Sequence, residues 1–174
     1  MPATLPFVRA LPKAETHLHL EGAVPWDLVR AHSAVPLPER PPWWDDGFRF
    51  EDFDHFRRVA QIYLACLTDL RAYGNAAAEI LGDLRGQNVR YVEISFDVER
   101  TARQALPLPA VVAAIKDAAP SGVRVSVLGG LSYHKVDRTP AGLIDRVLTT
   151  PRLDGIDLHG DETRQSAPRN GSSR

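Results

Sequence analysis

The chain has 174 residues, of which 44% are hydrophobic and 25% charged, and its formal net charge is −1 at pH 7. This balance lacks the basic excess that nucleic acids or anionic membranes attract, so we expect neither as a partner. The sequence has no apolar run long enough to cross a membrane and no signal-peptide core, and its single cysteine, Cys66, excludes an intramolecular disulfide. We therefore expect a cytoplasmic protein whose thiol is buried and structural.

The first expected strand carries the most informative stretch of the chain. Residues 11–22 read Leu-Pro-Lys-Ala-Glu-Thr-His-Leu-His-Leu-Glu-Gly. Side chains alternate along a strand, so His17 and His19 project to the same face. Neutral imidazoles are preferred zinc ligands, and a catalytic zinc needs about three protein ligands with one position open. A polar surface strand would show the same spacing, but the flanking leucines and the acid and glycine that follow favour a metal site.

The rest of the chain alternates between helical and strand-like patterns. Helical spacing of apolar residues follows Pro25 and recurs over 51–70, about 71–87, 107–119 and after Thr139–Pro140. Strand-like segments occupy 89–96, 123–128 (ended by Gly129–Gly130) and about 154–159. This alternation predicts a parallel α/β sheet, which fits half of a (β/α)8 barrel or a small open sheet. The paired histidines on the first strand favour the barrel.

Two segments stand apart from this alternation. Residues 35–46 contain four prolines, which predicts an irregular loop. With Trp43 and Trp44 we expect it to pass over the mouth of the barrel, and the alternative is a surface loop held by these two aromatic rings. Glu93 is the one acid inside an otherwise apolar strand. Because an unpaired buried charge is costly, we expect Glu93 to have an ionic partner with a structural role, and a catalytic role is the less favoured interpretation.

Two motifs resemble those of a known family. Residues 12–22 resemble the first-strand motif of the adenosine and adenine deaminases, zinc hydrolases of the amidohydrolase superfamily that adopt a (β/α)8 TIM barrel. Residues 155–162, Gly-Ile-Asp-Leu-His-Gly-Asp-Glu, resemble the fourth-strand motif, in which alanine more often stands at the place of His159. The resemblance implies a Zn²⁺ cofactor that activates water, and hydrolytic release of ammonia from an aminopurine nucleoside or base.

The same resemblance implies roles for individual residues. His17 and His19 match metal ligands, while His19, Glu21 and Gly160 match groups that contact the substrate, the glycine through its backbone amide. Adenosine deaminases usually carry aspartate in place of Glu21, so glutamate here looks more like the adenine deaminases and related branches. Asp157 and Asp161 are expected to be acids that stabilise the mouth of the barrel.

The resemblance covers only the N-terminal half of such an enzyme. We expect residues 1–162 to form about four βα units of the barrel and residues 163–174 to be a disordered tail. The family's other zinc ligands and its catalytic glutamate and histidine belong to the other half. No catalytic residue is therefore assigned in this chain, which we expect to be an inactive fragment that binds zinc weakly.

Three functions remain open from the sequence. The first is the deaminase function just described, and the second is that of another metal hydrolase of the superfamily with a different substrate pocket. The third is a non-catalytic half-barrel that acts as an interaction or regulatory subunit. Two unpaired strand edges and an expected open hydrophobic interior predict self-association in each case.

Overall fold

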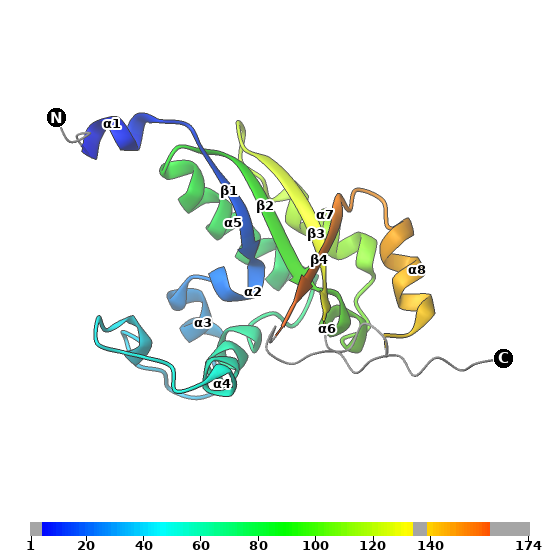
Figure 1. The fold of residues 1–174 in the computed structure, drawn as a ribbon, viewed down its shortest axis with the longest axis horizontal. Coiled ribbons are helices and arrows are strands. Elements are labelled where there is room, and N and C mark those ends of the chain that lie inside the picture. Colours follow the sequence, from blue (N-terminus) through cyan, green and yellow to red (C-terminus); the bar gives the residue numbers. More distant parts are fainter. Residues whose placement is uncertain (1–4, 134–138, 161–174) are drawn as a thin grey trace, which may run out of the picture.

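The computed structural model describes residues 5–133 and 139–160, and these form a four-stranded parallel sheet (Figure 1). Its strands are β1 (Lys13–His19), β2 (Val89–Asp97), β3 (Arg124–Ser132) and β4 (Gly155–His159). Each strand pairs with the next one along the chain, in the order β1-β2-β3-β4. The architecture is that of an α/β half-barrel, as the alternation of patterns predicted.

Helices connect the strands and vary widely in length. They are α1 (Leu5–Ala10), α2 (Leu20–Ala23), α3 (Trp26–His32), α4 (Phe53–Leu64), α5 (Leu70–Gly86), α6 (Val98–Arg103), α7 (Leu108–Asp117) and α8 (Ala141–Thr149). The pattern expected over 51–70 ends at Leu64, and Asp69 then starts the next helix by accepting a hydrogen bond from Ala72 N at 2.8 Å. The short helices α1, α2 and α6 were not predicted. None of the helices within the described ranges is both long and apolar enough to span a bilayer.

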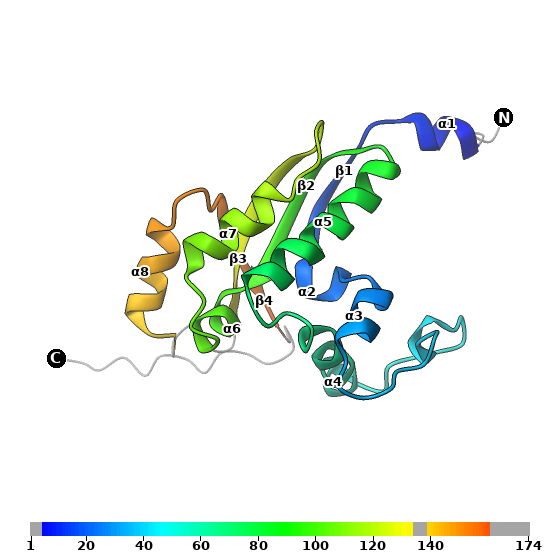
Figure 2. The same cartoon turned by 180° about the vertical axis from the view of Figure 1, so that it is seen from behind.

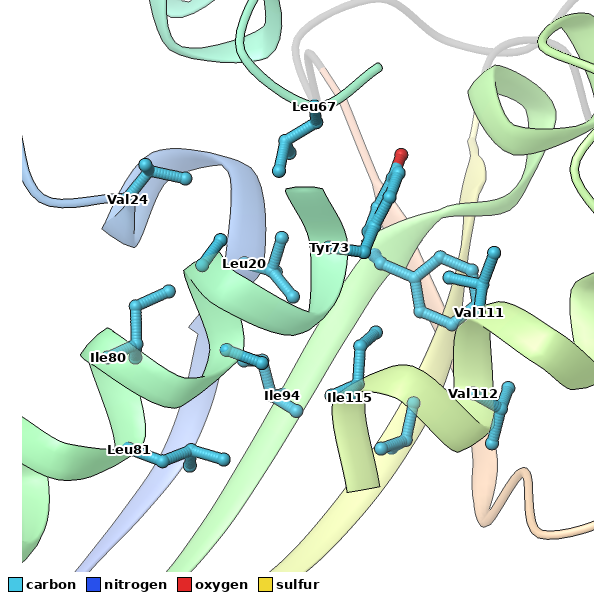
Figure 3. Close-up of a cluster of buried hydrophobic side chains, with 14 of the residues drawn as sticks. Leu20, Val24, Leu67, Tyr73, Ile80, Leu81, Ile94, Val111, Val112 and Ile115 are labelled. Carbon is cyan, nitrogen blue, oxygen red and sulfur yellow. The ribbon is translucent and has the colours of Figure 1, made fainter. Parts of the chain in front are cut away.

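The hydrophobic core lies between the sheet and two helices on its convex face. Figure 2 shows α5 and α7 lying across the strands on this side. Val92, Ile94 and Phe96 of β2 are at most 1% exposed. Figure 3 shows apolar residues of both helices, such as Leu81 and Val111, gathered around Ile94. Each fully buried side chain of this kind contributes about 1.5–3 kcal/mol, so this layer holds the sheet in place.

The loop between α3 and α4 is anchored by tryptophans. Within it, Pro42–Trp44 form one 3₁₀ turn. Trp43 donates through Nε1 to the Tyr63 hydroxyl at 3.0 Å, and Trp26 donates to the carbonyl of Pro38 at 3.0 Å. Cys66 is buried nearby and its thiol donates to the Tyr63 carbonyl at 2.9 Å, which confirms the expected structural thiol.

The concave face of the sheet is polar, contrary to the expected hydrophobic interior. The Tyr91 hydroxyl donates to Glu93 Oε1 at 2.7 Å and lies 3.1 Å from Ser126 Oγ, and the Arg124 guanidinium lies 5.7 Å from the Tyr91 ring centroid. Val92, Ile94 and Phe96 of β2 pack against the helices, so alternation turns Tyr91, Glu93 and Ser95 to the open side. Within the described part of the chain, Glu93 has a hydroxyl partner and no ion pair, so the expected ionic partner is not found there.

The Gly129–Gly130 pair does not end β3, as the sequence had suggested, because the strand continues to Ser132. A Cβ atom on Gly130 would lie 2.9 Å from the carbonyl oxygen of Phe96, and one on Gly129 would lie 3.1 Å from Val98 Cγ2. Real Cβ atoms almost never come as close as the first of these distances. The glycines therefore allow β3 to pack closely against β2 and the start of α6.

Replacing Gly130 with alanine should destabilise the fold. The added methyl group meets a backbone oxygen that cannot move aside, and overpacking of this kind typically costs about 1–3 kcal/mol. Urea unfolding followed by circular dichroism would measure the change. Gly82→Ala is a matched control, because a Cβ at this exposed position inside α5 meets nothing within 4 Å. It should stabilise the protein by about 0.5–1 kcal/mol. Equal effects of both substitutions would contradict this account.

Candidate functional site

The site begins at the C-terminal end of β1, where the strand is irregular. Glu15 pairs with Val92, and Leu18 pairs with Ile94. Between these two pairs β1 advances by three residues and β2 by only two, so β1 contains a β-bulge. The bulge disturbs strict alternation around His17, which is exposed, whereas His19 is half-buried. Their Nε2 atoms nevertheless lie 3.2 Å apart. The two imidazoles predicted to share a face therefore do converge.

A carboxylate from the opposite edge of the sheet joins the two histidines. Asp157 on β4 places Oδ1 at 3.9 Å from His17 Nε2 and Oδ2 at 3.8 Å from His19 Nε2. β1 and β4 do not pair with each other, so the curl of the sheet brings them together across its concave face. One potential ligand atom from each of the three residues lies within 4.8 Å of the others. This trio forms the candidate metal centre.

A buried serine holds the ring of His19. Ser95, which is 3% exposed and pairs with His19 in the sheet, places Oγ at 3.2 Å from His19 Nδ1. When Nδ1–H donates to this oxygen, the lone pair of Nε2 is free to face the other ligands. Burial lowers the pKa of His19, although the Asp157 carboxylate opposes this shift, so the neutral imidazole that metals require is favoured. The sequence analysis did not predict a role for Ser95. The only feature that could have indicated one is its position near the C-terminal end of β2.

The end of β4 borders the centre. The ring of His159 stacks on that of His19, with centroids 5.8 Å apart and planes tilted by 10°. Gly160 follows with φ of 135°, in the region that favours glycine, and it is exposed. The fourth-strand motif and the first-strand motif thus meet in space. Asp161 lies outside the described residues, as does the expected tail.

Glu21 lies just beyond β1 and connects the start of α2 to the end of β2 through a hydrogen bond. Its Oε1 accepts a hydrogen bond from the backbone N–H of Asp97 at 2.7 Å, where β2 ends and α6 begins. Asp97 in turn caps α6 by accepting from Arg100 N at 2.8 Å. Burial raises the pKa of the Glu21 carboxyl to about 7, with the nearby Asp97 carboxylate adding to the shift. In this structure Glu21 is an anchor between backbone segments.

The raised pKa of Glu21 should make stability depend on pH. The folded state holds the proton more tightly than the unfolded chain, where the pKa is near its ordinary 4.5. The stabilising contribution is therefore complete below about pH 4.5 and is lost as the pH rises towards about 7, up to about 3 kcal/mol in all. Glu21→Gln keeps an acceptor for Asp97 N and should remove this slope. Denaturant titrations across this pH window would measure it.

The matched control for this test is Glu79→Gln, because Glu79 is exposed on α5. This variant should keep the pH slope of the unmodified protein. A slope that survives in Glu21→Gln as well would show that another group causes it.

Comparisons with known proteins agree with this geometry. The family model described as adenosine deaminase matches residues 12–171. Aminodeoxyfutalosine deaminase of Streptomyces coelicolor is 30% identical over 119 residues, which cover 64% of this chain and 30% of that protein.

Solved structures show the same fold. Adenine deaminase from Arthrobacter aurescens superposes with a TM-score of 0.73 at 22% identity, over 88% of this chain and 50% of that one. An amidohydrolase from Burkholderia ambifaria with bound zinc gives a TM-score of 0.73 at 23% identity, over 97% and 49% of the two chains.

The chain thus spans about a third of the length of the curated relatives and half of these solved chains. Its family model match, its half-barrel and its converging first- and fourth-strand motifs lead to one conclusion: the chain belongs to the adenosine deaminase family.

Proposed function

We propose that this half-barrel contributes to a zinc site that deaminates an aminopurine by hydrolysis. The observation that carries the proposal is the 3.2 Å separation of the His17 and His19 Nε2 atoms. Two nitrogen ligands at about 2.0–2.1 Å from a tetrahedral zinc lie about 3.3 Å from each other. Two neutral imidazoles whose nitrogens already face each other at this spacing fit such an ion.

Each residue of the site has a task in this proposal. Zinc, when bound, activates water for attack on the purine carbon that bears the amino group. His17 and His19 hold the ion, and Ser95 fixes the ring of His19 so that Nε2 faces it. Gly160, which has no side chain to obstruct an approach, would offer its backbone to the purine ring. Glu21 would line the same pocket from the end of β1.

The names of relatives support a purine substrate. They include aminodeoxyfutalosine deaminase and several adenine deaminases. A purine base or nucleoside that carries an amino group is therefore the substrate class we propose.

The test begins with metal binding by the purified 174-residue chain. We expect calorimetry to show one weakly bound zinc per chain, and we expect the double variant His17→Ala, His19→Ala to lose it because both imidazole ligands are gone. His32→Ala is the control, since His32 lies on α3 and bonds the Leu28 carbonyl instead. Equal zinc affinity in the double variant would refute the assignment of the ligands.

The second part of the test is the reaction. Adenine, adenosine and adenosine monophosphate would be incubated with the zinc-loaded chain, and ammonia would be measured. Because the described residues supply one side of the site, we expect no release above background from this chain alone. The DNA beyond the codon for Glu162 would then be sequenced and translated in all three frames, to look for further histidine and aspartate ligands. Failure to find them would remove the support for a deaminase.

A second function, as an interaction subunit, is favoured by the outer face of β4. Ile156 and Leu158 point to the helical side of the sheet but are 43% and 55% exposed, because no described helix covers them. Exposed apolar side chains on an edge strand are typical sites of association. We propose a second copy of this chain as the partner.

This proposal predicts self-association that depends on β4. In size-exclusion chromatography with light scattering, the protein should elute as a dimer or larger. Ile156→Thr combined with Leu158→Thr should shift it towards monomer, because the apolar contact is removed. Leu148→Thr is the control, since Leu148 is 66% exposed and belongs to α8 instead of β4. A monomer before any substitution would rule out association through β4.

A further inference from the structure

A hollow lies among the helices, apart from the candidate metal centre. It has a volume of about 590 Å³ and is lined by residues of α6, of α8 and of the segment that leads into α7. Figure 2 shows α8 standing apart from α7 at this place. Pockets that bind small molecules typically have volumes of about 300–1,000 Å³. The hollow is therefore large enough for a small ligand, and it shares no residue with the metal centre on the concave face.

The wall of the hollow is aliphatic. Side chains such as Leu106, Leu108 and Leu143 line it, together with several prolines, and none of the described residues around it is aromatic. A planar base or ring gains energy by stacking on aromatic neighbours, which this wall does not offer. An aliphatic chain needs only close apolar contact. The wall thus favours an aliphatic ligand over a second purine.

The hydroxyl groups around the hollow are already engaged as donors. Thr101, Thr149 and Thr150 each donate to a backbone carbonyl three or four residues earlier, at 2.6 to 2.9 Å. Their hydrogens are therefore not available to a ligand. A sugar or another ligand rich in hydroxyl groups would gain few hydrogen bonds here, so the ligand we expect has one polar head on an apolar body.

Arg146 supplies the charge that selects this head. It is the only charged residue among the described residues that line the hollow, and its guanidinium forms no ion pair with any described carboxylate. In contrast, Arg103 lies 3.8 Å from Asp97 and Arg152 lies 2.8 Å from Asp117. One guanidinium can hold a carboxylate through two parallel hydrogen bonds. A phosphate group carries nearly two negative charges, which one arginine balances only in part.

We propose that the hollow between α6, α7 and α8 binds a small aliphatic carboxylate, with its chain against the leucine wall and its head on Arg146. The exposed helix α1 of a second copy is a poorer occupant, although it is apolar, because it carries Arg9 and no acid. Its charge would repel that of Arg146. The site is independent of the proposed zinc site, so each can fail without the other.

The experiment is a calorimetric titration of the 174-residue chain, without metal, with octanoate below the concentration at which it forms micelles. We expect saturable binding of one octanoate per chain. Octanol has the same kind of chain without the charge and should bind about fivefold more weakly, because a partly exposed charge pair contributes modestly to affinity. Arg146→Gln should lower octanoate affinity by the same factor and leave octanol affinity unchanged. Arg71→Gln is the control, since Arg71 is exposed on α5.

A second variant locates the bound chain. Ala102 is exposed on α6 and lines the hollow, so Ala102→Trp should fill it and abolish saturable binding of both ligands. Ala78→Trp is the matched control, because Ala78 is an exposed alanine on α5. Circular dichroism would show that both variants fold, and if Ala102→Trp does not, Arg146→Gln decides the question by itself.

Three outcomes would overturn the proposal. Equal affinities for octanoate and octanol would remove the role of the carboxylate and of Arg146. Binding that persists in folded Ala102→Trp would place the ligand elsewhere on the chain. The absence of saturable octanoate binding by the unmodified chain would remove the site altogether, whatever the chain does with zinc.

Discussion

The candidate site depends on the curl of a four-stranded sheet. β1 and β4 are its two edges and share no backbone hydrogen bonds, yet side chains from both meet within 4 Å. A flat sheet would separate these edges by about 14 Å, since neighbouring strands lie about 4.8 Å apart. The closeness of His19 and Asp157 therefore requires that β2 and β3 be held in a strongly curved arrangement, which the apolar layer under α5 and α7 and the close packing at Gly130 provide.

The two faces of the sheet have separate tasks. The convex face carries nearly all the apolar burial, and Val92 and Ile94 are fully enclosed there. The concave face holds hydrogen-bonding groups such as Tyr91 and Glu93. Polar residues on this side contribute little to the core, so they are free to serve binding and chemistry. Ser95 depends on both faces of the sheet. Its neighbours Ile94 and Phe96 are buried in the core on the convex face, while its hydroxyl lies 3.2 Å from His19 Nδ1 on the concave face.

Local patterns predicted much of this arrangement, and long-range contacts account for the rest. The spacing of His17 and His19 on a strand predicted their convergence, and the alternation of apolar periods predicted the parallel sheet. The role of Gly129–Gly130 could not be read from the sequence, because a glycine that ends a strand and one that lets two strands approach look alike. The meeting of Asp157 with the histidines depends on sheet curvature, which no short stretch encodes. Glu21 was matched to a substrate contact, but its bond to Asp97 N depends on a segment far along the chain.

The candidate metal centre draws its residues from both edges of the sheet, and this placement has a thermodynamic consequence. Edge strands have neighbours on one side only and are the first to fray, so their amide hydrogens exchange with solvent sooner than those of β2 and β3. An ion held by β1 and β4 would bridge the two strands that open most readily. Metal affinity and the local stability of the edges would then be coupled, because a bound ion would stabilise the strands from which its ligands come.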